Sequence, residues 1–345
     1  MLVDMNGKDL ICTQEISVKE IKAILKLASE MKSDRYGEKY NSLLKDKTFL
    51  MFFYNPSLRT RISFEAAATE LGGHAQFLEP AAMRLRKTKG GIEVQAGETI
   101  EDVAKVLDRY GCGIGIRILE TAVENYGEGD ALLREFAKYM KIPIINMADD
   151  KYHPCQGLAD VMGMREHKGN LNGKTILMTW AHGSLARSYC SVHENLLITS
   201  RLGMNVRLAY PKGYDLPEEE IAKVKANCEV NDRKFEIYHN PDEAYTKEVE
   251  FVYSRNWFGP DFYEIGKQSE IERASKMTNW ICTEERMKRT NEGLFTHPMP
   301  VDRGKEVTDE VASGPRSIII DIAENRLHIQ KAIMAMIIAG LKVEI

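Results

Sequence analysis

The chain has 345 residues, of which 43% are hydrophobic and 28% charged, and this composition is that of an ordinary globular protein. Its net charge of −4 argues against a nucleic-acid-binding surface, and no apolar run approaches the ~20 residues that a membrane-spanning helix needs. Six cysteines without a Cys-x-x-Cys pair argue against a disulfide framework and against a zinc site.

The first half of the chain alternates between predicted helices and predicted strands. Its first four residues, Met-Leu-Val-Asp, lack the basic and apolar regions of a signal peptide, so we expect a cytoplasmic protein. The pattern of apolar residues predicts helices at 18–32, 62–71 and 100–110, and it predicts buried strands at 48–54 and 113–118. This alternation indicates a parallel sheet with helices on both faces.

The same alternation resumes after residue 155. We predict strands at 175–180, 205–210, 250–253 and 317–322, and helices at 191–202, 217–227, 283–290 and 324–341. A chain of this length exceeds the usual size of one hydrophobic core, which favours two domains. We therefore predict an α/β protein with two doubly wound parallel-sheet domains, one formed by residues 1–150 with the C-terminal helix 324–345 and one by residues 151–323.

Residues 57–61, Ser-Leu-Arg-Thr-Arg, form the most informative segment. They follow an apolar strand, and the preceding Asn-Pro supplies turn chemistry, so Ser57 is expected to cap a helix. A helix N-terminus offers free N–H groups and the positive end of the helix dipole, and arginine suits a phosphate because its planar fork donates in pairs. The segment therefore predicts a phosphate site. The alternative is a capped surface helix whose arginines face water, which for Arg61 alone is equally acceptable.

Three further polar residues are predicted at the carboxyl ends of other strands. Arg117 closes an apolar run, and His153 and Gln156 lie three residues apart at the start of a helix, so they can face one cleft. A histidine at a helix N-terminus tends to stay neutral and can donate a hydrogen bond to a carbonyl oxygen. Gln156 can accept from an amide N–H₂ group. The alternatives are a surface charge at Arg117 and a structural capping role for His153.

Two other loops are less specific. In His-Pro-Met-Pro, residues 297–300, the prolines fix the backbone and leave carbonyl groups that suit an incoming amine, although an ordinary rigid loop is the alternative. Residues 169–175, Gly-Asn-Leu-Asn-Gly-Lys-Thr, look like a nucleotide P-loop, but they have three residues between the glycines instead of four and precede their strand. The acidic residues show no metal-ligand spacing. We therefore predict neither a metal nor a cofactor.

Taken in order, residues 57–61, Arg117, 153–156, 297–300 and 324–326 resemble the motifs of the aspartate/ornithine carbamoyltransferase family over essentially the whole chain. The resemblance implies a carbamoyl-phosphate domain, an amine-substrate domain and a homotrimer with active sites between subunits. The residues that it implies at carbamoyl phosphate are Ser57, Leu58 through its backbone, Arg59, Thr60, Arg117, His153, Gln156 and Arg326. The catalytic residues that it implies are Arg59, Thr60, Arg117, His153 and Gln156.

The residue chemistry agrees with this resemblance. Attack by a neutral amine on the carbamoyl carbon places negative charge on the carbonyl oxygen, which Arg117, His153 and Thr60 are suited to stabilise. Phosphate then leaves, its charge matched by Arg59 and the helix end. Orientation in a site closed to water supplies the rest of the rate. The implied partners are carbamoyl phosphate and a small amine, with no nucleic acid, no membrane and no cofactor.

The segments expected at the second substrate depart from the ornithine and aspartate branches and resemble the N-acylornithine branch most. That branch carries a lysine where Arg255 stands, a proline-rich loop where residues 181–188 stand, and an arginine where Asp302 stands. A loop at 83–95 is expected to reach a neighbouring subunit's site. The residues that we expect at the second substrate are Arg255, Trp257, His297, Pro298, Met299, Asp302, Arg303 and Arg86.

We therefore expect a carbamoyltransferase that acts on a small carboxylate-bearing amine, such as an N-acylornithine-like compound or another amino acid. One alternative is a catabolic enzyme that phosphorolyses a ureido compound, and another is an ornithine or aspartate carbamoyltransferase. A third is a non-catalytic paralogue that binds a small anion. The intact set of catalytic residues favours catalysis, since a binder would need fewer of them.

Overall fold

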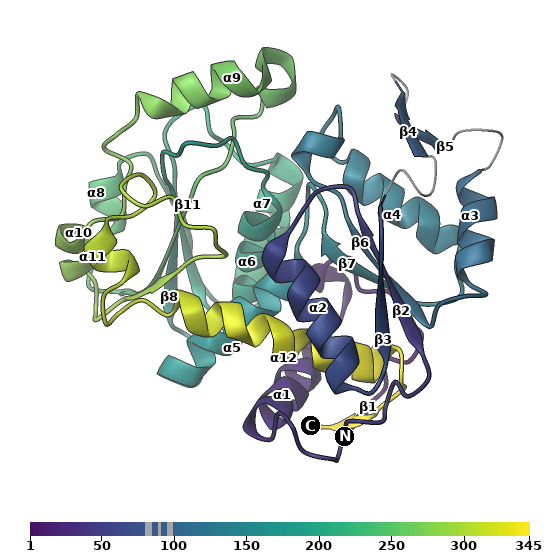
Figure 1. The fold of residues 1–345 in the computed structure, drawn as a ribbon. Helices are drawn as coiled ribbons and strands as arrows, with labels where there is room; N and C mark the ends of the chain where they lie inside the picture. The colour runs from purple at the N-terminus through teal and green to yellow at the C-terminus, as the bar shows by residue number, and fades with distance from the viewer. Residues whose placement is uncertain (80–84, 89–90, 95–98) are drawn as a thin grey trace. The chain divides into compact units, whose positions relative to one another are not determined.

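Two parallel β-sheets organise the chain in the computed structural model, which describes residues 1–79, 85–88, 91–94 and 99–345 (Figure 1). Residues 85–88 and 91–94 are described by their backbone. The chain divides into two units: unit 1 comprises Met1–Leu158 and Glu324–Ile345, and unit 2 comprises Ala159–Ala323. The change of unit expected at residue 150 falls instead inside helix α5 (Pro154–Lys168), because this helix carries the chain from one unit into the next without a break.

Unit 1 contains a four-stranded parallel sheet in the order β3-β2-β6-β7. The connections leave β2 toward β3 on one side, and they later run to β6 and β7 on the other side. The sheet is therefore doubly wound, and the direction in which successive strands are added reverses between β2 and β6. The strands of unit 1 are β1 (Leu2–Val3), β2 (Thr48–Phe53), β3 (His74–Leu78), β4 (Leu85–Thr88), β5 (Gly91–Val94), β6 (Gly113–Arg117), β7 (Ile144–Ala148) and β13 (Val343–Glu344).

The helices of unit 1 cover both faces of this sheet. Helix α2 packs on β3, whereas α3 and α4 pack together on the opposite face (Figure 1). This placement follows from right-handed crossovers, because connections that run in opposite directions must lie on opposite faces. Strands β1 and β13 pair antiparallel, so the two ends of the chain lie side by side (Figure 1). The helices are α1 (Val18–Ser33), α2 (Leu58–Glu70), α3 (Ile100–Leu107), α4 (Glu128–Tyr139) and most of α12 (Ile319–Ile337), whose first residues belong to unit 2.

Unit 2 contains a five-stranded parallel sheet in the order β10-β9-β8-β11-β12. In this sheet, the direction in which successive strands are added reverses between β8 and β11. Helices α6 and α7 cover one face, and α8, α10 and α11 lie on the other (Figure 1). The strands are β8 (Thr175–Trp180), β9 (Asn205–Ala209), β10 (Phe235–Tyr238), β11 (Val249–Arg255) and β12 (Leu294–Thr296). The helices are α6 (Cys190–Arg201), α7 (Glu218–Val230), α8 (Pro241–Ala244), α9 (Phe262–Ser275), α10 (Glu284–Lys288) and α11 (Asp309–Ala312).

The predicted fold class is confirmed, but the prediction of a strand at 317–322 is wrong. Helix α12 begins at Ile319, inside this range. The run Ser-Ile-Ile-Ile favours a strand by its β-branched residues, yet packing of the whole apolar helix overrides that local preference. Strands β10 and β12 complete the sheet of unit 2, and neither was predicted because runs of four and three residues carry little periodicity.

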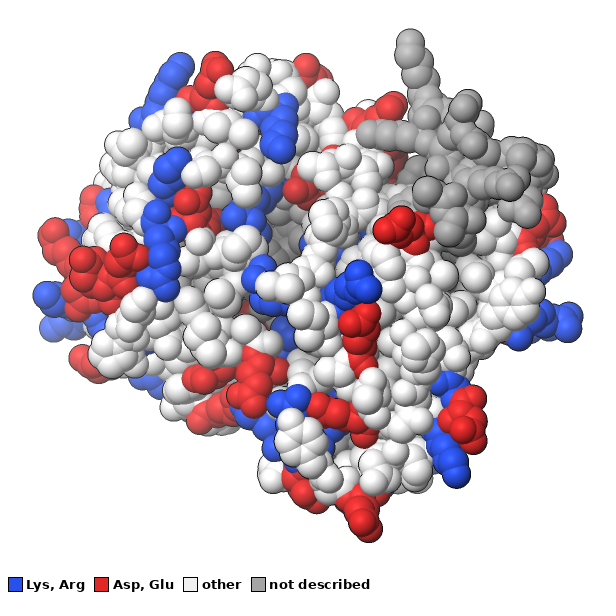
Figure 2. Space-filling view, viewed as in Figure 1, with Lys and Arg blue, Asp and Glu red and all other residues white. Residues whose placement is uncertain are grey.

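Charged side chains of both signs are interspersed on the face shown in Figure 2. Nucleic-acid-binding surfaces concentrate basic side chains in a patch or stripe, which the described residues on this face do not do. None of the helices in the described ranges is both long and apolar enough to span a membrane.

A buried acidic pair follows β7. Asp149 accepts a hydrogen bond from Lys151 N at 2.7 Å, and Asp150 accepts from Gly127 N and from Asp130 N, the latter at 3.2 Å. Burial raises the pKa of Asp150 to about 6, although these N–H groups oppose the shift. Burial and the neighbouring Asp150 likewise raise the pKa of Asp149. The folded protein therefore favours the protonated form of the carboxyl groups in the turn that leads from β7 into α5.

We expect Asp150→Asn to change the pH dependence of folding stability. The Asp150 carboxyl holds its proton to about pH 6 in the folded state but only to about pH 4 in an unfolded chain. Its stabilising contribution is therefore complete below about pH 4 and is lost as the pH rises through about 6. In urea unfolding, the free energy of unfolding of the variant should rise by on the order of 2 kcal/mol relative to that of the wild type between pH 4 and pH 7.

The control for this measurement is Asp232→Asn, on an exposed turn. It should follow the wild-type pH profile. A free-energy difference between Asp150→Asn and the wild type that stays constant with pH would contradict the prediction.

Candidate functional site

Each sheet leaves one pair of strand ends uncovered. Where the direction of the connections changes, helices depart on opposite faces, and α/β proteins bind ligands beyond the carboxyl ends of the two strands concerned. These strands are β2 and β6 in unit 1 and β8 and β11 in unit 2. Half-site 1, in unit 1, consists of residues 57–60, Arg117, His153, Gln156 and Arg326. Half-site 2, in unit 2, consists of residues 181–187, Arg255 and 297–306.

The phosphate-binding candidate in half-site 1 is the N-terminus of α2. Ser57 is the N-cap, and its Oγ accepts a hydrogen bond from Thr60 N at 3.3 Å. Leu58 is 72% exposed, and because its side chain has no hydrogen-bond donor, its backbone N–H is the group able to bind an anion. The positive end of the α2 dipole thus lies at the carboxyl end of β2, where the sequence predicts it.

The two arginines of this segment have different surroundings. Arg61 Nε donates to Glu65 Oε1 at 3.0 Å, and the Arg61 guanidinium lies 4.0 Å from the centroid of the Phe77 ring. Arg59 lies half-buried in the first turn of α2. Because Arg61 already has a carboxylate and an aromatic ring, the surface-helix interpretation applies to it, and Arg59 stays the phosphate-binding candidate that the resemblance implies.

The register of the sheet brings Arg117 beside the start of α2. Arg117 is the last residue of β6 and pairs with Phe53, the last residue of β2. Beyond these strands, Asn55 Nδ2 donates to Thr121 Oγ1, and Leu119 N donates to Asn55 Oδ1, both at 2.6 Å. A single amide side chain therefore fixes the turn that leads into α2 against the turn that follows Arg117.

Arg326 joins three segments of half-site 1. Its side chain, on α12, donates to Gln156 Oε1 at 2.8 Å and to Thr60 Oγ1 at 3.3 Å. Gln156 belongs to α5 and Thr60 to α2, and all three residues are buried. His153, just before α5, is buried as well. The structure thus gathers residues that the sequence places far apart.

A buried carboxylate organises half-site 2. Glu306 Oε1 accepts from Asn256 N at 2.9 Å, and Oε2 accepts from Asp302 N at 2.8 Å and from His297 Nε2 at 3.1 Å. Arg255 NH1 lies 3.6 Å from Glu306 Oε1. Burial alone would raise the pKa of Glu306, but His297 and Arg255 outweigh burial and hold this pKa well below its usual range. Glu306 is therefore ionised at neutral pH.

His297 stabilises the loop that it begins. Its Nδ1 accepts from Met299 N at 2.9 Å, so the ring proton lies on Nε2, which donates to Glu306. Burial lowers the pKa of His297 to about 4 against the opposing effect of Glu306. With both nitrogens engaged and the side chain fully buried, His297 holds the loop in place and leaves no ring nitrogen for a substrate.

Polar contacts tie the two loops of half-site 2 together. Asp302 Oδ2 accepts from Ser184 N at 2.5 Å, and Lys305 Nζ donates to Ser184 Oγ at 2.7 Å. Residues 181–187 and 297–306 therefore support each other, and the positions of Asp302 and Lys305 are set by both loops.

The carbonyl groups of the 297–300 loop are directed differently from the expectation. Pro298 is buried and Met299 half-buried. Pro300 O accepts from Arg187 NH2 at 3.3 Å and from Arg255 NH1 at 3.5 Å. The carbonyl that was expected to receive a substrate amine thus holds two arginine side chains of the protein.

Two residues expected at the second substrate use their side chains for other contacts in unit 2. Trp257 is fully buried, and its Nε1 donates to Tyr214 O at 2.9 Å, so it packs in the core. Arg303 is exposed, and its NH1 donates to Asp309 Oδ1 at 2.9 Å and to Ser313 Oγ at 2.8 Å. Trp257 thus lies outside half-site 2, and Arg303 belongs to one of its loops but directs its side chain to Asp309 and Ser313.

The loop at 83–95 is described only in part. Strands β4 and β5 form an antiparallel pair, and Arg86 lies in β4. The loop contains a basic run at 84–89, Arg-Leu-Arg-Lys-Thr-Lys, of which Arg84 and Lys89 lie outside the described residues. The expected reach of this loop into a neighbouring subunit stays a prediction.

Half-site 2 is held together by contacts of Glu306, Ser184 and Lys305, which the sequence pattern did not single out. For Glu306, one signal was available in the sequence. The backbone N–H groups that follow Pro300 need acceptors, and Glu306 is an acidic residue close to them in the sequence. Its burial becomes apparent only in the folded chain.

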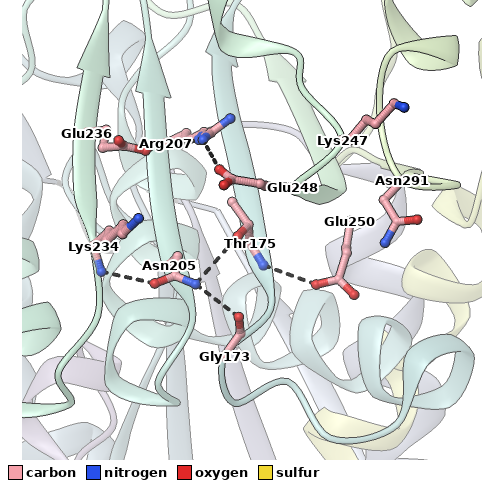
Figure 3. A pocket seen from close by; sticks show the side chains of 10 residues that line it. All are labelled: Gly173, Thr175, Asn205, Arg207, Lys234, Glu236, Lys247, Glu248, Glu250 and Asn291. Atoms are coloured by element: carbon pink, nitrogen blue, oxygen red, sulfur yellow. Dashed lines mark hydrogen bonds and ion pairs between the residues drawn. The ribbon is translucent and has the colours of Figure 1, made fainter.

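A separate pocket of about 330 Å³ lies at the opposite, amino-terminal edge of the unit 2 sheet (Figure 3). Arg207 is buried there, and its Nε donates to Glu236 Oε2 at 3.1 Å. Thr175 N donates to Glu250 Oε2 at 3.3 Å, so the P-loop-like residues 169–175 bind a carboxylate of their own unit. Since charges of both signs compensate one another in this pocket, half-site 2 is the better candidate. In the described parts of the chain, no three His, Cys, Asp or Glu side chains are grouped to hold a metal ion.

Comparison with protein families gives two matches that together cover most of the chain. Residues 8–166 match the carbamoyl-P binding domain of aspartate/ornithine carbamoyltransferase, and residues 181–337 match the Asp/Orn binding domain. The first range holds most of half-site 1, and the second holds half-site 2. The resemblance inferred from the motifs is confirmed.

Individual relatives belong to two branches. The chain is 35% identical to ornithine carbamoyltransferase of Pyrococcus abyssi over 344 residues, 99% of each chain. It is 36% identical to N-acetylornithine carbamoyltransferase of Xanthomonas campestris over 346 residues, 97% of this chain and 98% of the relative. Among solved structures, acetylornithine transcarbamylase complexed with acetylcitrulline matches with a TM-score of 0.87 and 35% identity, covering 96% of this chain and 99% of that one. Ornithine carbamoyltransferase from Pyrococcus furiosus matches with a TM-score of 0.84 and 33% identity, covering 98% and 99%.

We expect Glu306→Gln to destabilise the protein by about 2–4 kcal/mol. The amide removes the negative charge beside buried Arg255, and it offers one acceptor oxygen to groups that now use two. Denaturant unfolding of the full chain measures the loss. Glu310→Gln, at an exposed position on α11, is the matched control and should change stability by less than about 0.5 kcal/mol. Equal stability of the two variants would show that Glu306 is not the organising residue.

Proposed function

Because this chain belongs to the aspartate/ornithine carbamoyltransferase family, we propose that it moves the carbamoyl group of carbamoyl phosphate to the amine of a small carboxylate-bearing substrate and releases phosphate. The chain is a carbamoyltransferase, and its second substrate is an amino acid or a derivative of one. Relatives at similar identity are named for ornithine and for N-acetylornithine, so both are candidates for the acceptor.

One observation carries the proposal. The Arg326 side chain donates to Thr60 and to Gln156, beyond the carboxyl ends of the strands in unit 1. Thr60 is expected at the phosphate and Gln156 at the carbamoyl group. A buried guanidinium next to a helix N-terminus creates a positive potential that favours a dianionic ligand such as carbamoyl phosphate.

Half-site 1 suits the movement of charge in carbamoyl transfer. As the amine nitrogen bonds to the carbamoyl carbon, the carbonyl oxygen gains negative charge, and Arg117, His153 and Thr60 offer donors to it. The bond from this carbon to the bridging oxygen then breaks, and its electron pair leaves with the phosphate. Arg59 and the N-terminus of α2 stabilise that leaving group. The proton that the amine loses balances the reaction by forming hydrogen phosphate.

Half-site 2 suits a small substrate with charged groups. It presents the cations Arg255 and Lys305 and the anion Asp302 on loops that are fixed by Glu306 and Ser184. Fixed groups lose little freedom on binding, which favours recognition of a small polar molecule. A carboxylate on the substrate would meet the cations. The family also supports a homotrimer, which stays a prediction.

We expect His153→Ala to lower kcat for carbamoyl transfer by about a hundredfold, because the variant loses a donor to the developing oxyanion. The assay measures phosphate and ureido product formed from carbamoyl phosphate with ornithine or N-acetylornithine. In the wild type, the two products should appear in equal amounts. Binding of carbamoyl phosphate without any ureido product would favour the non-catalytic alternative, and an unchanged kcat in the variant would remove His153 from the mechanism.

The two arginines of α2 offer a matched pair of variants. Arg59→Ala should raise the KM for carbamoyl phosphate by about tenfold or more, because it removes a charged donor to the phosphate. Arg61→Ala should leave this KM within about twofold, because Arg61 is engaged by Glu65 and Phe77. Steady-state kinetics with carbamoyl phosphate as the varied substrate measures the KM of both variants. A larger effect at Arg61 than at Arg59 would reverse our assignment.

A further inference from the structure

His182 is held at the uncovered end of β8 by its neighbours in the chain. Ala181 N donates to Arg255 O at 3.0 Å, and Ala181 O accepts from Asn256 Nδ2 at 3.0 Å. His182 N donates to Trp280 O at 2.9 Å. Each contact fixes the backbone from which the imidazole ring projects and uses neither ring nitrogen.

The residue after His182 adds to this rigidity. A Cβ atom at Gly183 would lie 3.1 Å from Cβ and Cγ of Asn256, so the backbone packs closely there. The His182 residue is 7% exposed, and its ring makes no hydrogen bond with any described residue. The ring therefore keeps hydrogen-bonding capacity that no described residue of half-site 2 uses and that a ligand could use.

The charged groups that act on this ring all belong to half-site 2. They are Lys305, Asp302 and Glu306, and burial together with Lys305 lowers the pKa of His182. The imidazole is therefore neutral at pH 7, with one N–H donor and one acceptor nitrogen. A neutral ring of this kind can accept a hydrogen bond from an ammonium group.

Hydrogen-bonding capacity remains on two of these neighbours. Glu306 is occupied by the N–H groups of the loop. Asp302 accepts one hydrogen bond, from Ser184 N, and so has a second oxygen available. Lys305 donates once, to Ser184 Oγ, and has further N–H groups. The open groups are thus an anion, a neutral acceptor and a cation.

We propose that Asp302 and His182 bind the free α-ammonium group of the second substrate and that Lys305 binds its α-carboxylate, an inference that rests on the proposed carbamoyl transfer. The substrate class is a diamino acid whose side-chain amine is carbamoylated. An α-ammonium group neutralises Asp302 and donates to the acceptor nitrogen of His182. An acylated α-nitrogen is neutral and has one N–H, so it would leave the Asp302 charge uncompensated. The arrangement therefore favours a free amino acid such as ornithine over its N-acyl derivative.

The test compares three amines at saturating carbamoyl phosphate: L-ornithine, Nα-acetyl-L-ornithine and 1,4-diaminobutane, which lacks a carboxylate. The full-length wild type should show a kcat/KM for ornithine that is about tenfold to a hundredfold above that of either other amine. Asp302→Asn and His182→Phe should each raise the KM for ornithine by about tenfold, leave the KM for carbamoyl phosphate unchanged, and reduce the preference over the acetylated amine. His182→Gln retains an acceptor and should recover part of the loss.

The matched control is His239→Asn, at an exposed histidine whose Nδ1 lies 3.0 Å from Tyr210 O, and it should keep wild-type kinetics. A kcat/KM for the acetylated amine or for the diamine that equals or exceeds that for ornithine overturns the inference and leaves carbamoyl transfer standing. An unchanged KM for ornithine in Asp302→Asn also overturns it, and this outcome can be read even where His182→Phe fails to fold. If no amine yields a ureido product, the proposed function itself fails.

Discussion

The right-handed crossover is the constraint on which both half-sites depend. In each unit, the chain builds its sheet outward in two directions, so the connecting helices must depart on opposite faces from one pair of central strands. The carboxyl ends of those strands are left uncovered, and polar residues can stand there without opening a hydrophobic core. Ser57 and Arg117 use this position in unit 1, and His182 and Arg255 use it in unit 2.

The two half-sites hold their charged groups in different ways. In half-site 1, backbone N–H groups at the start of α2 and side chains from α5 and α12 approach a common point, so much of the positive potential comes from the fold itself. In half-site 2, one buried carboxylate, Glu306, gathers a ring nitrogen, two backbone N–H groups and an arginine. Half-site 1 is therefore matched to an anion, whereas half-site 2 presents fixed groups of both signs.

Much of half-site 1 could be predicted from the sequence because its signals are local. A cap residue after an apolar run marks Ser57, and the end of an apolar run marks Arg117. Half-site 2 was harder to predict because its geometry depends on contacts between distant loops. Arg303 and Trp257 have suitable chemistry but point to other partners, while Glu306 has no distinctive spacing. The same limit explains the strand wrongly expected at 317–322, where long-range helix packing overrides a local β-branched preference.

Unit 1 is discontinuous along the chain, and this affects the order in which the protein can fold during synthesis. Its last helix carries Arg326, and β13 pairs with β1, so both elements emerge from the ribosome after all of unit 2. Unit 2 is continuous and can fold as soon as its residues are available. The nascent chain therefore lacks Arg326 and β13 while unit 2 is being synthesised, so half-site 1 can be assembled only after the residues of unit 2 have been made.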